Sequence, residues 1–115
     1  MKKYNERIVR IASELMSFSY KINSTKFNIN VESLNDKTII DFKIYNAHID
    51  EKTFTTTKKL LSSPRLHELE EYYWTLSGND MTNTELSLVG MMTDEAVVKY
   101  DLENHILFIK LIRID

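Results

Sequence analysis

Apolar residues in the first part of the chain recur at steps of three and four positions. The members of this series are Ile8, Ile11, Leu15, Phe18 and Ile22. Since an α-helix has about 3.6 residues per turn, this spacing gathers the apolar side chains on one face. The pattern predicts an amphipathic helix over residues 4–21, with Arg7 and Glu14 on or near its solvent side.

After this helix the apolar period changes to two. Apolar and polar residues alternate over Phe27–Val31 and again over Ile40–Ile44, which is the pattern of half-buried β-strands. The connection Ser33–Lys37 contains Asn35 and Asp36, two residues that tolerate left-handed backbone and hydrogen-bond their own main chain. We therefore predict a β-hairpin directly after the first helix.

Three helices are predicted in the middle of the chain. Each begins at residues that suit a helix N-terminus. They are 51–61, capped by Asp50; a second opened by Ser63–Pro64 and ended by Gly78; and a third that runs from the Thr82–Glu85 capping box to about Met92.

Two more strands, Ala96–Tyr100 and Ile106–Ile114, surround a turn at Asp101–Asn104 and close the chain. The predicted order over residues 1–115 is α-β-β-α-α-α-β-β in a single domain. Two hairpins separated by helices favour a two-layer α/β (α+β) sandwich, with about four mostly antiparallel strands and the helices on one face.

The last strand is apolar on both sides. Leu107, Ile109 and Leu111 form one face. The opposite face holds Ile106, Phe108, Ile112 and Ile114. Helices on one layer cover only one face of a sheet, so the second face needs another cover. Loops of the same chain are one candidate, and a homodimer or protein partner docked on those four residues is the other.

Composition narrows the function classes. The 115 residues carry a net charge of −2, so we expect no binding to nucleic acid. No apolar run is long enough to span a membrane, and cysteine is absent, which favours a cytoplasmic location. The three histidines, His48, His67 and His105, lie far apart in the sequence, so we expect no metal site and no catalytic set.

Several motifs resemble those of the GHKL (Bergerat-fold) ATPases, especially anti-sigma-factor kinases and histidine-kinase catalytic domains. The first helix keeps a glutamate at Glu14, with Phe18 where that family has asparagine. Asn46 lies near the position of the adenine-reading aspartate, and Glu85 and Ser87 occupy the places of the lid glycines. The closing segment 93–100 is similar to the family's last hairpin.

The resemblance implies an ATPase-like fold whose nucleotide motifs are largely lost. We therefore expect a pseudoenzyme, a non-catalytic regulatory module that contacts a protein partner or a second copy through Ile106, Phe108, Ile112 and Ile114. The alternative is a diverged nucleotide-binding protein or kinase that holds ATP with Mg²⁺ through Glu14 and Asn46. A third hypothesis is a sensor for a small apolar ligand beneath Tyr72 and Trp74.

Overall fold

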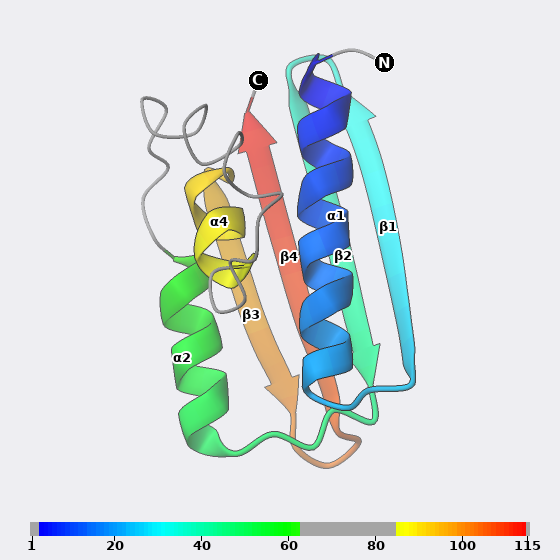
Figure 1. The fold of residues 1–115 in the computed structure, drawn as a ribbon, viewed down its shortest axis with the longest axis vertical. Helices are drawn as coiled ribbons and strands as arrows, with labels where there is room; N and C mark the ends of the chain where they lie inside the picture. Colours follow the sequence, from blue (N-terminus) through cyan, green and yellow to red (C-terminus); the bar gives the residue numbers. More distant parts are fainter. Residues whose placement is uncertain (1–2, 63–84, 115) are drawn as a thin grey trace.

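A computed structural model describes residues 3–62 and 85–114 of the chain, and these form a four-stranded sheet with helices on one of its faces (Figure 1). The elements are α1 (Lys3–Lys21), β1 (Lys26–Leu34), β2 (Lys37–Tyr45), α2 (Glu51–Leu61), α4 (Glu85–Met91), β3 (Glu95–Asp101) and β4 (Ile106–Ile114). The predicted α+β sandwich is confirmed. The predicted helix over 63–78 and the Thr82 cap lie outside the described residues.

All strand pairs in the sheet are antiparallel, and the strand order is β1-β2-β4-β3. The two predicted hairpins therefore lie side by side, with the second strand of each hairpin at the centre. In this central pair Ile40 is opposite Leu111 and Ile44 is opposite Leu107. Pairing β2 with β4 thus joins the two halves of the chain in one sheet.

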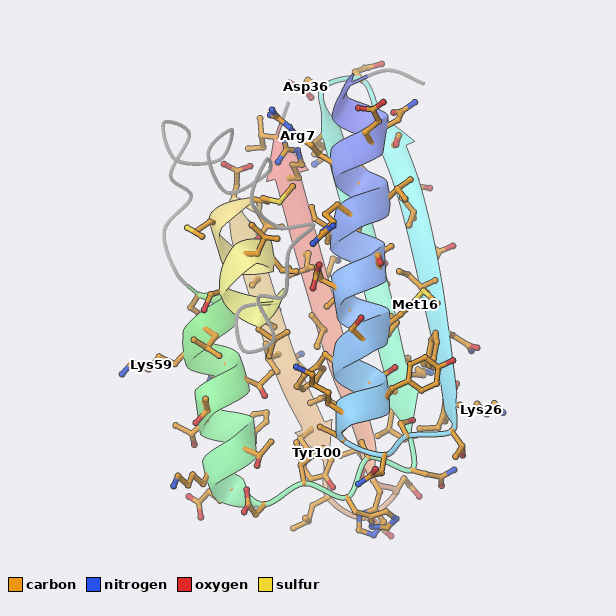
Figure 2. The ribbon with its side chains drawn as sticks, viewed as in Figure 1. Arg7, Met16, Lys26, Asp36, Lys59 and Tyr100 are labelled. Carbon is orange, nitrogen blue, oxygen red and sulfur yellow. The ribbon has the colours of Figure 1, made fainter. Side chains whose placement is uncertain are left out.

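Helix α1 packs on the sheet through the apolar face that its sequence predicts. Ile11 and Leu15 are completely buried, while Tyr20 is exposed. One assignment on this helix was wrong, because Arg7, expected near solvent, is only 6% exposed. Figure 2 shows Arg7 near the end of the molecule that also holds Asp36.

Local hydrogen bonds cap the start of α2 and satisfy backbone groups within α2 and at the end of α4. The predicted N-cap of α2 is confirmed, since the Thr53 backbone NH donates to Asp50 Oδ1 at 2.7 Å. Within α2 the Thr57 hydroxyl donates to the Thr53 carbonyl at 2.8 Å. Just after α4 the Thr93 hydroxyl donates to the Val89 carbonyl at 3.1 Å, which accommodates a buried threonine at this end.

The core lies between the helices and the inner face of the sheet. Its largest contribution comes from alternate residues of the two central strands, as strand geometry requires. These are Ile40, Phe42 and Ile44 of β2 with Leu107, Ile109 and Leu111 of β4. Leu61, Val89 and Met92 from the helical layer belong to the same core cluster.

Candidate interaction surface

The other face of the sheet points away from α1, α2 and α4 (Figure 1). Successive strand residues point to opposite sides, so the pairing register identifies every side chain on this second face. We call this set the open face: Lys26, Asn28, Asn30, Glu32 and Leu34 of β1; Lys37, Ile39, Asp41, Lys43 and Tyr45 of β2; Ile106, Phe108, Lys110, Ile112 and Ile114 of β4; and Glu95, Val97, Lys99 and Asp101 of β3.

The four residues predicted to contact a partner all lie on the open face. Ile106, Phe108 and Ile112 are half-buried, and Ile114 is 48% exposed. Their strand neighbour on the opposite side, Ile109, is buried in the core. The two-sided apolar strand therefore has a helix-covered side and a side that these helices leave uncovered.

The middle of the open face holds a hollow of ≈ 560 Å³, to which all four strands contribute. Its outward-pointing lining residues are Asn28, Asn30, Asp41, Lys43, Val97, Lys99, Phe108 and Lys110. This volume falls within the range of about 300–1,000 Å³ that is usual for binding sites. Except for Phe108, sequence reasoning missed these residues, because their proximity depends on the β2–β4 pairing.

Lysine side chains on the open face lie over aromatic rings. The Lys43 Nζ is 5.2 Å from the centre of the Phe108 ring and 5.6 Å from that of Tyr45. The Lys26 Nζ is 4.8 Å from the Tyr45 ring centre. Such cation–π contacts at exposed sites contribute about 0.5–1 kcal/mol each, and the lysine stems cover apolar surface that is otherwise wet.

The open face carries both signs of charge in nearly equal number. Five lysines, at positions 26, 37, 43, 99 and 110, accompany four acidic residues, at positions 32, 41, 95 and 101. Asp41 and Lys110 are directly opposite each other on the two central strands. A surface of this kind has no strong field toward a polyanion.

A second group of polar side chains lies at one end of the sheet. His48 and His105, which lie far apart in the sequence, come together in the structure, and their ring centres are 4.1 Å apart. The cause is again the β2–β4 register, in which Ile44 opposite Leu107 brings the loop after β2 to the turn before β4.

Backbone and side-chain hydrogen bonds join these two loops. The Tyr100 hydroxyl donates to the Ala47 carbonyl and lies 3.3 Å from His105 Nδ1. The Ala47 NH donates to the His105 carbonyl at 2.8 Å. Figure 2 shows Tyr100 at the end of the sheet opposite to Asp36. We interpret this group as a structural contact that holds the two hairpins together at this end of the sheet.

The turn beside this contact contains a strongly hydrogen-bonded carboxylate. Asp101 accepts from the Asn104 side chain at 2.9 Å and from the backbone NH groups of Glu103 and Asn104 at 3.1 Å. These bonds, that of the Asn104 side chain first, lower the pKa of Asp101. Within residues 3–62 and 85–114 no three His, Asp or Glu side chains are placed to share a metal ion.

Of the two residues of the nucleotide alternative, Glu14 has a partner within its own helix. The Arg10 Nε lies 2.8 Å from the Glu14 carboxylate, one helical turn away. The structure thus pairs Glu14 with Arg10 rather than with Asn46, which lies in the loop after β2 with φ of 54°. Phe18, at the family's asparagine position, is part of the core. Tyr72 and Trp74 lie outside the described residues.

Comparison with protein-family models, curated proteins and solved structures found no match for this chain. In the parts of the chain that the structure describes, no helix has the length and apolar character needed to cross a membrane.

Proposed function

We propose that this chain is a non-catalytic, cytoplasmic regulatory module that acts by binding a protein through the open face. The observation that supports this most directly is the position of Phe108 and Ile112. Both are large apolar residues on a central strand, and both point away from the helices that cover the core. Apolar side chains gathered in this way usually mark a surface that meets another protein.

The distribution of side chains on this face suits protein recognition. Ile39, Ile112 and Ile114 form an apolar area on the two central strands, and Phe108 lines the hollow beyond the row of Asp41 and Lys110. Lysines and acidic residues surround and interrupt this area. An apolar centre with polar and charged neighbours is the common composition of non-obligate interfaces.

The chemistry of the open face favours binding over catalysis. Serine, cysteine and histidine are missing from its described residues, so it offers no nucleophile paired with a histidine base. Lys26 and Lys43 lie over aromatic rings of the same face. Such side chains position and select a partner.

Two substitutions, one on each side of β4, test the proposal. Ile112→Asp adds a charge to the open face, so we expect a folded protein with a melting temperature close to that of the native chain. Ile109→Asp places an unpaired charge in the core and should lower the free energy of unfolding by more than about 4 kcal/mol. Circular dichroism with thermal unfolding separates the two variants.

Binding is then compared between the native chain and the folded Ile112→Asp variant, by affinity capture from a cell extract and by sedimentation. We expect an association that the native chain makes and the variant loses. A molten Ile112→Asp protein would show that this face is core. A saturable thermal shift with MgATP that Glu14→Gln removes would instead support nucleotide binding.

A further inference from the structure

We propose that the occupant of the open face is a second copy of this chain, in a twofold dimer with the two sheets packed face to face. This inference rests on the proposed function and names its partner. A twofold interface brings one surface against itself, so residue i of one copy meets residue j of the other and the reverse. The open face must therefore be complementary to itself.

The pairing of the central strands supplies this complementarity. A twofold axis parallel to β2 and β4, midway between them, places β2 of one copy over β4 of the other. Every β2–β4 cross-strand pair within one chain then becomes a pair between chains. The central rows of the open face are Lys43 with Phe108, Asp41 with Lys110, and Ile39 with Ile112.

Each of these rows is favourable when it is formed between two copies. Asp41 faces the partner's Lys110, which pairs opposite charges, and Ile39 faces the partner's Ile112, which buries apolar surface. Lys43 faces the partner's Phe108, the same cation–π combination that the structure already shows within one chain at 5.2 Å.

An axis perpendicular to the strands and passing through the row of Asp41 and Lys110 gives a poorer match. It places Asp41 over the partner's Asp41 and Lys110 over the partner's Lys110, which sets like charges against each other. The axis parallel to the strands brings like charges together only at a corner, where Glu32 of β1 meets the partner's Glu95. Packed sheets cross at about 30°, which favours close contact at the centre over the corners.

The hollow has a role in this arrangement. It lies over the rows that contain Asp41, Lys43, Phe108 and Lys110, so side chains from the same rows of the partner project into it. A partner with strong negative charge, such as a nucleic acid, is less suited, because the face has four acidic residues for its five lysines.

The size of the open face determines how strongly we expect the two copies to bind each other. Four strands of up to nine residues cover about 19 Å by 30 Å. Two copies would bury roughly 1,100 Å², which is near the lower limit for a specific interface. We therefore expect a dimer with a dissociation constant on the order of micromolar.

Charge reversal tests the inference directly. Asp41→Lys alone should not dimerise, because the introduced ammonium would face the partner's Lys110. Lys110→Asp alone should also remain monomeric, because two acidic residues would meet. In an equal mixture the reversed charges face each other, so we expect a heterodimer whose mass by sedimentation velocity is twice that of either variant.

The expected results are a native dimer at about 100 µM, two monomeric variants and a dimeric mixture. Both positions are exposed, so each variant should fold, as circular dichroism will verify. A monomeric native chain at this concentration, or a mixture that stays monomeric, would overturn the inference. So would tight binding of a labelled single-stranded oligonucleotide that Lys110→Asp abolishes.

Failure of this inference is distinguishable from failure of the proposed function. If the native chain is monomeric but captures a protein that Ile112→Asp does not, the second copy is excluded and the binding face remains. If Ile112→Asp is molten, the open face is core and both proposals fail.

Discussion

Arg113 is a charged residue that the structure buries within the last strand. In the sequence it interrupts the apolar pattern of the last strand, yet the structure leaves it only 1% exposed. It points toward the helical layer, and its Nη1 donates to the Met92 carbonyl at 2.7 Å. A buried guanidinium here satisfies a backbone carbonyl just beyond the end of α4.

Replacing Arg113 should therefore destabilise the protein. Arg113→Met fills similar volume but leaves the Met92 carbonyl without this donor, so we expect the free energy of unfolding to fall by about 1–3 kcal/mol. Arg113→Lys should restore only part of the loss, because an ammonium lacks the planar fork of donors. Urea denaturation measures all three proteins. An unfolding free energy unchanged in Arg113→Met would contradict this role.

Predictions for single residues were correct where the apolar pattern of one element was enough to determine the burial of the residue. Ile11 and Leu15 were placed correctly because helical period alone identifies their face. Arg7 was misplaced, and the proximity of His48 and His105 was missed. Both errors concern positions whose surroundings come from other elements, which no local pattern describes.

At the scale of elements, the α2 cap was predictable because Asp50 acts on residues next to it in sequence. Hydrogen bonds from Thr53, the side chain first and the backbone NH second, lower the pKa of Asp50. A carboxyl whose pKa is lower in the folded state stabilises the fold above its unfolded-state pKa of about 3.9. That contribution is lost as the pH falls through the folded-state value.

This gives a pH-dependent prediction for Asp50→Asn. Asparagine also caps helices but does not titrate near pH 4. We expect the native chain to be the more stable protein by a constant margin above about pH 5. The margin should shrink as the pH falls below about 4. Urea unfolding of both proteins, from neutral pH into acid, measures this difference in the free energy of unfolding. Because Asp101 is present in both proteins, its own contribution cancels in the comparison. A margin that widened in acid would contradict the assigned cap.

The elements themselves were largely predictable, and their pairing was not. All four strands were predicted, the first two of them from the period of two, and the predicted Phe27–Val31 lies within β1. The pairing of the two hairpins through β2 and β4 depends on contacts between residues that are far apart in the sequence. Apolar alternation is the same for several strand orders, so it does not select one.

At the scale of the whole molecule, strand order decides where binding residues gather. With β2 and β4 at the centre, Asp41, Lys43, Phe108 and Lys110 come together on one face from distant parts of the chain. The two-sided apolar pattern of Ile106–Ile114 predicted that this face exists. Its charge pairs and its hollow required the register, which the sequence alone did not specify.

The most direct test of the face-to-face dimer is methyl NMR of the isoleucines at several protein concentrations. Dilution of the dimer should shift the open-face methyl groups of Ile39, Ile106, Ile112 and Ile114, and leave the buried Ile11, Ile40 and Ile109 nearly unchanged. Shifts confined to another surface, or no shifts from about 1 mM to about 10 µM, would contradict this dimer.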